Sequence, residues 1–504
     1  MIEGLLQGFV TVAEPGNLVL VFIGTALGIL VGALPGLSSP MAIIVLLPIT
    51  FSMEPLPALL LMIGIYVGTK LGGSFSAILL RTPGTPAAAC TALDGYPMAQ
   101  KGEAGLALGY ATMGSTIGGV FGWILAVTFI PLISSIAIKS SPADIALIAI
   151  AGLVMVSAFV RGSMLRGLIG VILGIMISTV GLDPQDAIER YTFDILNLMS
   201  GIPFAAALIG LFGFTVVFSD MEMIGKVDKL VDSKVNLALP KIKDLLRYWE
   251  SVAIGTLYGT GVGAVPGVGA EGATWLAYAT ARNRSKEPEK FGTGIPEGIL
   301  TPESANNATT GGTMIPLLTL GIPGDGSTAV MLGAMLLHGI DPGVTLMEES
   351  ADLVHGILAG LLIATIFMFL IAWGAIKYFI FILQRDRSWL FPFVLVLATV
   401  GAFASTNTFF TVFAAIGFGV VGYIMEKRNF PVVTIVLGVI LGPIIEINFR
   451  LGLLLSNHDY TTFVATWPRQ LIVVAIVLLV GREIYVGIKQ EWLNRTVVKA
   501  PISD

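Results

Sequence analysis

The amino-acid sequence predicts an all-α polytopic membrane protein. Of its 504 residues, 55% are hydrophobic and only 12% are charged, whereas a soluble domain carries about 25% charged residues. Its apolar stretches continue for about 18 to 25 residues, the length of a membrane-spanning helix, and lack the alternation of a membrane β-barrel. The chain also has 60 glycines and 26 prolines, many helix-breaking residues for a helical bundle. We therefore expect roughly 11 to 14 membrane elements, some of them half-helices or re-entrant hairpins.

The composition excludes several kinds of site and partner. Cys90 is the only cysteine, so the chain can form neither an internal disulfide nor a thiolate metal cluster. The three histidines are too far apart for a multi-histidine site on one helix. A net charge of −5 without a basic cluster excludes nucleic acid as a partner, and the absence of a GxxxxGK[ST] loop excludes ATP hydrolysis. We therefore expect no enzyme activity and no cofactor.

The distribution of Lys and Arg predicts the orientation and the division of the chain. The first basic residue is Lys70, whereas 220–250 holds Lys226, Lys229, Lys234, Lys241, Lys243 and Arg247. Basic loops stay in the cytoplasm, so we expect a periplasmic N-terminus and a cytoplasmic C-terminus. The predicted parts are a first membrane repeat at 1–219, a cytoplasmic polar linker at 220–250, a second membrane repeat with additional scaffold helices at 251–488, and a cytoplasmic tail at 489–504.

Two Pro-Gly motifs occur twice in the same order, which indicates an internal repeat. Gly32-Ala-Leu-Pro35-Gly36 corresponds to Gly263-Ala-Val-Pro266-Gly267, 231 residues later (263 − 32). Gly72-Gly73 followed by Thr82-Pro83-Gly84 corresponds to Gly311-Gly312 followed by Ile322-Pro323-Gly324, with Pro323 lying 240 residues after Pro83 (323 − 83). The first motif starts from the side without Lys or Arg and the second from the basic linker, so we expect inverted-topology repeats.

Pro-Gly breaks inside a membrane helix are typical of the binding sites of secondary transporters. A break frees backbone N–H groups that can bind a carboxylate and carbonyls that can hold a cation. In the alternative interpretation, the Pro-Gly pairs only kink helices and the glycines only allow close packing. Hydroxyl and amide side chains flank the breaks, which favours a site for an organic anion: Ser38, Ser39, Ser74, Ser76, Thr82, Thr85, Asn306, Asn307, Thr309, Thr310, Ser327 and Thr328.

Ionisable residues within apolar stretches are costly and indicate a pathway or a pair. Lys70 and Arg81 could supply positive charge to an anionic substrate, or they could reach the membrane interface or neutralise Asp94. Asp325 could bind a coupling cation or cap the following helix. Glu303 could fix a loop instead of meeting the substrate. Glu446 and Arg450, four residues apart, are typical of a structural pair.

Two long motifs resemble the signatures of the TctA family, the large membrane subunit of tripartite tricarboxylate transporters. The first runs from Gly72-Gly-Ser through Arg81-Thr-Pro-Gly-Thr-Pro86 to Leu93-Asp-Gly95, and the second from Phe291-Gly-Thr-Gly through Pro302-Glu-Ser-Ala-Asn-Asn307 to Gly321-Ile-Pro-Gly324. The resemblance covers about residues 15 to 480. It implies a permease of the bacterial inner membrane that imports organic anions with a small TctB-like membrane subunit and a periplasmic TctC-like solute-binding protein.

The sequence departs from the family pattern at Lys70 and Arg81, and both residues add positive charge near the expected site. We therefore expect a di- or tricarboxylate substrate, imported by symport with Na⁺ or H⁺ through alternating access. The predicted ion-coupling residue is Asp325, and we expect no metal site other than one for Na⁺. The predicted substrate-binding residues are Gly36, Ser38, Lys70, Ser74, Arg81, Thr82, Gly84, Gly267, Asn306, Asn307, Gly324, Ser327 and Thr328.

Three alternatives stay open at this point. The chain could be a stand-alone carboxylate carrier, a channel or, much less in keeping with the sequence, a membrane-embedded hydrolase. The last would resemble an intramembrane aspartyl protease at Gly321-Ile-Pro-Gly-Asp325, but the spacing differs and no convincing second aspartate lies on a facing span. The chain could also form a homo-oligomer.

Overall fold

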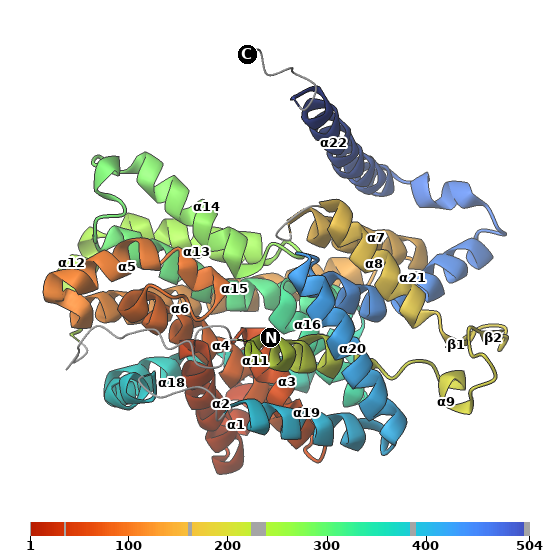
Figure 1. Ribbon diagram of the computed structural model, residues 1–504, viewed down its shortest axis with the longest axis horizontal. Coiled ribbons are helices and arrows are strands. Elements are labelled where there is room, and N and C mark those ends of the chain that lie inside the picture. The colour runs from red at the N-terminus through yellow and green to blue at the C-terminus, as the bar shows by residue number, and fades with distance from the viewer. Residues whose placement is uncertain (1, 35–36, 160–163, 223–237, 384–389, 498–504) are drawn as a thin grey trace, which may run out of the picture. The chain divides into compact units, whose positions relative to one another are not determined.

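The computed structural model describes residues 2–34, 37–159, 164–222, 238–383 and 390–497, and most of them are helical (Figure 1). The only strands in these ranges are β1 (Gly181–Leu182) and β2 (Glu189–Arg190), which pair antiparallel with Gly181 opposite Arg190. The predicted all-α polytopic membrane fold is therefore confirmed.

The helices before the linker often begin at a proline. Pro15, Pro40 and Pro55 occupy the first turns of α2, α3 and α4, where a missing N–H costs nothing. These helices are α1 (Ile2–Val12), α2 (Pro15–Ala33), α3 (Ser39–Thr50), α4 (Pro55–Leu80), η1 (Pro86–Ala89), α5 (Ala92–Met98), η2 (Ala99–Glu103), α6 (Ala104–Ala137), α7 (Pro142–Phe159), α8 (Met164–Ser178), α9 (Leu196–Met199), α10 (Phe204–Leu208), η3 (Ile209–Phe214) and α11 (Thr215–Met221).

The helices after residue 237 are also a mixture of short and long elements. They are α12 (Ile242–Arg247), α13 (Trp249–Gly263), α14 (Gly269–Arg284), η4 (Pro288–Lys290), α15 (Glu297–Leu320), α16 (Gly326–Leu337), α17 (Leu346–Glu349), α18 (Ala351–Leu383), α19 (Leu390–Thr406), α20 (Phe409–Lys427), α21 (Val432–Leu455), η6 (Tyr460–Val464) and α22 (Trp467–Val497). The helices α13, α14 and α15 pack on one another (Figure 1).

Seven helical stretches in the described residues are long and apolar enough to cross a membrane, and six shorter apolar helices have 10–17 residues. The short ones include α3, which follows the longer helix α2, and α16, which follows the longer helix α15. The seven stretches are Pro15–Ala33, Pro55–Leu80, Ala92–Ala137, Pro142–Phe159, Ala351–Ala375, Phe409–Lys427 and Val432–Leu455.

The chain divides into two compact units, and each unit takes segments from both sides of the linker. The first comprises Met1–Lys139 and Ile202–Ile424, and the second comprises Ser140–Gly201 and Met425–Asp504.

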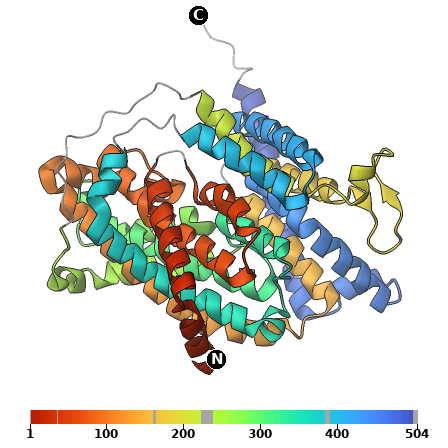
Figure 2. The ribbon, with the colours of Figure 1, turned by 90° about the horizontal axis from the view of Figure 1, so that it is seen from below.

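Glycines bring α2 and α4 of the first unit into close, parallel contact. A Cβ on Gly24 would lie 2.2 Å from the Leu61 carbonyl oxygen, and one on Gly28 would lie 2.4 Å from that of Ile65. Both partner positions advance by four residues, so the two helices run in the same direction. Such close approach of backbones is the packing that small residues allow between membrane helices. The long helix α18 packs against α1, α2 and α4 in the same unit (Figure 2).

The pair α13 and α15 repeats this packing at shifted positions. A Cβ on Gly255 would lie 2.4 Å from the Thr301 oxygen, and one on Gly259 would lie 2.4 Å from the Ala305 oxygen. Gly255 and Gly259 follow Gly24 and Gly28 by 231 residues, and Thr301 and Ala305 follow Leu61 and Ile65 by 240 (255 − 24, 301 − 61). These are the offsets of the two sequence motifs, so the repeated sequence makes repeated helix contacts.

The second unit is held by α21, which packs against α7 and α8. Gly174 and Gly438 face each other's helices: their Cβ atoms would lie 2.1 Å from the Ile435 oxygen and 2.4 Å from the Val171 oxygen. The Nε of Arg450 lies 3.6 Å from Oε1 of Glu446, so the predicted structural pair is confirmed.

Candidate functional site

The turn after α4 packs against the end of α2, and the corresponding turn after α15 packs against the end of α13. After α4 ends, Arg81 has a left-handed φ of 58°, and the N–H of Gly84 then donates to the Gly73 oxygen at 3.1 Å. A Cβ on Gly84 would lie 1.8 Å from the Gly32 oxygen, so only glycine fits here. The first break, Pro35-Gly36, lies outside the described residues, and the prediction for Gly36 falls with it.

The second half repeats this arrangement, and here the structure describes every residue of both Pro-Gly motifs. After α15 ends, Gly321 has a φ of 67°. The N–H of Gly267 donates to the Gly324 oxygen at 2.9 Å, which joins the two breaks directly. A Cβ on Gly324 would lie 2.6 Å from the Gly263 oxygen. The predicted residues Gly84 and Gly324 thus lie against the ends of α2 and α13, and Gly267, with a φ of 83°, lies against Gly324; these positions need glycine for steric reasons.

Helix α4 of the first half and its counterpart in the second half, α15, run antiparallel where they contact each other. Tyr66 of α4 contacts Thr313 of α15, and Ser74, two turns later, contacts Glu303, which lies earlier in α15. Between them, the Asn306 side chain donates to the Lys70 oxygen at 3.3 Å. The antiparallel crossing is what an inverted repeat requires, while the direction of the two halves relative to a bilayer stays a prediction.

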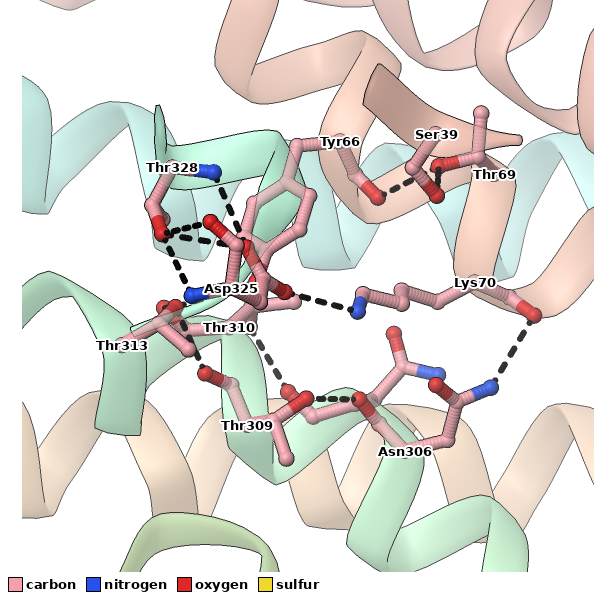
Figure 3. Close-up of polar contacts among 11 residues, drawn as sticks. Ser39, Tyr66, Thr69, Lys70, Asn306, Thr309, Thr310, Thr313, Asp325 and Thr328 are labelled. Atoms are coloured by element: carbon pink, nitrogen blue, oxygen red, sulfur yellow. Dashed lines mark hydrogen bonds and ion pairs between the residues drawn. The ribbon is translucent and has the colours of Figure 1, made fainter. Parts of the chain in front are cut away.

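Lys70 and Asp325 form a buried ion pair between the two halves (Figure 3). The Lys70 Nζ lies 3.4 Å from Oδ2 of Asp325, with 6% and 12% of the two side chains exposed. The Tyr66 hydroxyl donates to the same Oδ2 at 2.8 Å, and the ammonium lies 4.7 Å from the Tyr66 ring centroid. A charge pair removed from water is costly unless each charge is paired and hydrogen-bonded. Here the Asp325 carboxylate pairs with the Lys70 ammonium and also accepts a hydrogen bond from the Tyr66 hydroxyl.

Asp325 also caps α16, so the predicted capping role is confirmed, while its role in ion coupling stays a prediction. Its Oδ1 accepts from the Thr328 N–H at 2.9 Å, and the Asp325 N–H donates to Oγ1 of Thr328 at 2.9 Å, which forms a capping box. The other oxygen, Oδ2, faces Lys70 and Tyr66. The cap fixes the carboxylate and leaves one of its oxygens directed at the ammonium.

Two neighbouring amides contribute polar atoms that have no partner among the described residues. Asn306 and Asn307 are fully buried, and Oδ1 of Asn306 and both side-chain polar atoms of Asn307 lack a hydrogen bond. Oγ1 of Thr260, 5% exposed, is also unpaired. A buried amide that makes no hydrogen bond costs free energy, about 1–3 kcal/mol for each group. Asn306, which contacts Lys70, and its neighbour Asn307 thus present unpaired buried atoms on α15, and such groups are suited to a polar ligand.

The other predicted residues are distributed around this cluster. The Ser74 hydroxyl turns to Glu303, and Oγ1 of Thr82 donates to the Leu80 oxygen at 3.3 Å. Ser327 is buried in α16, and the half-buried Ser38 precedes α3 without capping it. Arg81 is exposed, and its guanidinium lies 5.7 Å from the Tyr96 ring centroid, apart from the Lys70 pair.

Asp94 is satisfied without a cationic partner. Its carboxylate accepts from the N–H groups of Gly292, Gly294 and Ile295 and, at 2.8 Å, from the Tyr278 hydroxyl. The interpretation that Lys70 or Arg81 neutralises Asp94 is therefore wrong. Instead, the Leu93-Asp-Gly95 motif of the first half holds the Phe291-Gly-Thr-Gly motif of the second half in place.

Two important side chains were not among the predicted site residues. Tyr66 lies in an apolar run and has no flanking motif, so nothing in the sequence marks it. Glu303 lies in the Thr301-Pro-Glu-Ser-Ala-Asn-Asn307 run, and an acid inside a helix of the membrane core was a detectable signal. It is fully buried and fixes no surface loop.

Comparison with known proteins agrees with the motifs. Residues 18–437 match the tripartite tricarboxylate transporter TctA family. An uncharacterized 52.8 kDa protein in the TAR-I ttuC' 3'region of Agrobacterium vitis is 36% identical over 92% of each chain. An uncharacterized protein in the TAR-II ttuC' 3'region of Agrobacterium vitis is 35% identical over 41% of this chain and 85% of that protein. No solved structure matches the chain. The resemblance drawn from the motifs is confirmed, and the chain belongs to the tripartite tricarboxylate transporter TctA family.

Proposed function

We propose that this chain is the permease subunit of a binding-protein-dependent secondary transporter that imports di- or tricarboxylates by cation symport. It would lie in the bacterial inner membrane with its N-terminus in the periplasm and its C-terminus in the cytoplasm. Its partners would be a small TctB-like membrane subunit and a periplasmic TctC-like binding protein, which delivers the substrate. Family membership supports the tripartite assembly.

The observation that carries the proposal is the buried Lys70–Asp325 pair beside the unpaired amides of Asn306 and Asn307. A substrate carboxylate can replace Asp325 as the partner of the ammonium, because both are carboxylates. The coupling cation can then replace the ammonium as the partner of Asp325. Such an exchange keeps every buried charge paired at each step, as a low-dielectric site requires.

The joined breaks of the second half suit a mechanism of alternating access. Lys70 belongs to the first half and Asp325 to the second, so their ion pair connects the two halves next to these breaks. We expect the breaks to move together against the longer helices, either as an elevator or as a rocking bundle.

The first test compares uptake by the wild type with uptake by the Lys70→Ala/Arg81→Ala variant. The chain is expressed with its two partners, and the uptake of labelled citrate and succinate is measured. We expect the apparent affinity to fall at least tenfold in the variant and to be unchanged in Lys286→Ala, which removes an exposed lysine. An unchanged affinity in the double variant would remove the cationic part of the site.

A channel or a stand-alone carrier gives different results in the same assay. A channel equilibrates the substrate, whereas a symporter accumulates it and loses the accumulation when an ionophore collapses the ion gradient. A stand-alone carrier would not need the binding protein. We expect accumulation that depends on both the gradient and the binding protein, and no hydrolysis of the substrate.

A further inference from the structure

Glu303 is an ionisable residue in the interior that the proposed exchange at Lys70 and Asp325 does not use. It lies in α15 and is fully buried. Its Oε1 accepts hydrogen bonds from the hydroxyls of Ser74 in α4, at 2.5 Å, and of Thr91, and its Oε2 accepts from the Ser115 hydroxyl in α6 at 2.7 Å. Three separate segments thus each provide one hydroxyl to a single carboxyl group.

No positive side chain accompanies this carboxyl group. Among the described residues, no Lys, Arg or His forms an ion pair with Glu303, and Lys70, one turn before Ser74 on α4, directs its ammonium to Asp325. The other cationic groups on the helices packed around Glu303 are Arg282 and Arg284 of α14; both are exposed, and they bond to the Pro288 oxygen and to Glu250. The remaining titratable groups on α4, α5, α6, α13, α14 and α15 are acids and tyrosines: Tyr66, Asp94, Tyr96, Tyr110, Glu250, Tyr258, Glu271, Tyr278 and Glu297. An ionised Glu303 would therefore be a buried anion without a countercharge, which is strongly unfavourable.

The geometry favours a proton over a metal ion as the source of the missing charge. The 2.5 Å and 2.7 Å separations are those of direct O–H···O hydrogen bonds. Oxygen ligands about 2.4 Å from a cation stand roughly 3 Å or more from one another, so a metal ion would have to push these groups apart. Glu303 also packs closely on α6, since a Cβ on Gly114 would lie 3.1 Å from the Cβ of Glu303.

The surrounding hydroxyls can serve both protonation states without a change of backbone. A hydroxyl donates one hydrogen bond and accepts others, so it can donate to a carboxylate or accept from a carboxylic acid. Ser74 has a second acceptor, the Lys70 carbonyl oxygen, at 3.5 Å. When Glu303 is protonated, Ser74 can donate its hydroxyl hydrogen to that oxygen and accept a hydrogen bond from the carboxylic acid.

This second acceptor connects Glu303 to the candidate substrate site. The Lys70 oxygen also accepts from the Asn306 side chain at 3.3 Å, and Asn306 lies one turn after Glu303 on α15. Protonation of Glu303 thus changes the hydrogen bonding of an oxygen that belongs to the Lys70 and Asn306 group. A carrier couples a substrate and an ion only if both favour the same conformation. The Lys70 oxygen connects the proton site with the candidate substrate site, because Ser74 and Asn306 both donate to it.

We propose that Glu303 is the proton-binding group of the transporter. It takes one proton from water on the side from which substrate enters, is a neutral acid during the conformational change, and returns the proton to water on the other side as a carboxylate. The inference rests on the proposed carrier function. It assigns H⁺ as a coupling ion that binds at Glu303 and its Ser74, Thr91 and Ser115 hydroxyls, separately from the cation proposed to pair with Asp325.

The first experiment follows the proton itself and needs neither substrate nor partners. Infrared difference spectra of the purified chain are recorded between an acidic and an alkaline pH, for wild type, Glu303→Gln and the control Glu289→Gln, whose side chain is exposed. We expect a pH-dependent band of a protonated carboxyl group that Glu303→Gln lacks and Glu289→Gln keeps. A band that remains in Glu303→Gln overturns the assignment.

Folding of the variant is controlled in the same preparation. Glutamine matches the size of a neutral glutamic acid and still accepts hydrogen bonds, so Glu303→Gln should elute and melt as the wild type does. If it does not fold, Ser115→Ala replaces it. Removing that donor should change the midpoint pH of the band, and an unchanged midpoint overturns the assignment.

The second experiment separates coupling from transport. The chain and its partners are reconstituted in vesicles, and labelled citrate and succinate are followed during net uptake driven by a pH gradient and during exchange with internal unlabelled substrate. Glu303→Gln should reduce the accumulation ratio to about 1 and retain exchange, since exchange requires no net proton release.

The outcomes distinguish the two proposals. If wild type and Glu289→Gln transport neither probe, the proposed function fails, while the infrared result still decides the protonation of Glu303. If wild type accumulates substrate and Glu303→Gln does so equally, the carrier function stands and the assignment of the proton site is wrong. Accumulation driven by Na⁺ and independent of the pH gradient would also overturn it.

Discussion

At the scale of single residues, the site depends on one ion pair whose two members come from different halves of the chain. Lys70 and Asp325 are 255 residues apart in sequence, and both were marked by their position in apolar stretches. Their mutual contact could not be predicted, since it depends on how α4 crosses α15. Tyr66, which contacts both, carried no signal because a tyrosine in an apolar run is ordinary core composition.

The Lys70–Asp325 pair gives a stability prediction. Lys70→Met should lower the free energy of unfolding by about 3–5 kcal/mol, because it leaves a buried aspartate without its partner. Adding Asp325→Asn should recover most of this loss. Thermal denaturation in detergent measures both effects, and uptake should stay absent in the double variant. A double variant that is no more stable than Lys70→Met would show that the pair is not coupled.

At the scale of helices, glycines set the distances between neighbours. The repeat of the Pro-Gly motifs was visible in the sequence, and the same offsets of 231 and 240 reappear in the contacts of Gly24 with Leu61 and Gly255 with Thr301. The close pairing of α2 with α4 could not be predicted. Regularly spaced glycines show that one face of a helix carries small residues, but they do not identify the helix that packs on that face. The antiparallel crossing of α4 and α15 was likewise expected only in general terms.

Two glycines of α13 provide a matched pair of substitutions. A Cβ on Gly259 would lie 2.4 Å from the Ala305 oxygen, whereas one on Gly261 meets nothing within 4 Å. Gly259→Ala should therefore destabilise the protein by about 1–3 kcal/mol through overpacking. Gly261→Ala should be neutral or stabilising by up to about 1 kcal/mol, because alanine favours the helix. Equal melting temperatures for the two variants would contradict the close packing of α13 on α15.

In the second unit, Asp183 connects the β1–β2 hairpin to α21. The N–H groups of Asp186 and Gln185 and the guanidinium of Arg450 donate to its carboxylate and hold the pKa of Asp183 well below its usual range. The stabilisation is present while Asp183 is ionised and is lost as pH falls through that lowered pKa. Asp183→Asn should therefore lower the melting temperature at about pH 7 and still do so at about pH 5. A difference that vanishes at about pH 5 would mean that Asp183 is already protonated at that pH, which contradicts a lowered pKa.

At the scale of the whole molecule, composition was enough to predict the fold class, and motifs were enough to predict the family. The predicted membrane character follows from apolar length alone, and seven long apolar helices in the described residues agree with it. The two compact units could not be predicted, since each combines segments from both sides of the linker. Sequence proximity favours halves that fold separately, whereas the packing of α21 on α7 and α8 joins distant segments.

The most direct test of the account is accumulation of a labelled carboxylate by the reconstituted three-part system. We predict that citrate or succinate rises above its external concentration only with the binding protein and an ion gradient, and that Asp325→Asn abolishes this accumulation while Glu289→Gln retains it. Accumulation that is unchanged in Asp325→Asn, or uptake that stops at equal concentrations in the wild type, would contradict a cation-coupled site at the crossing of α4 and α15.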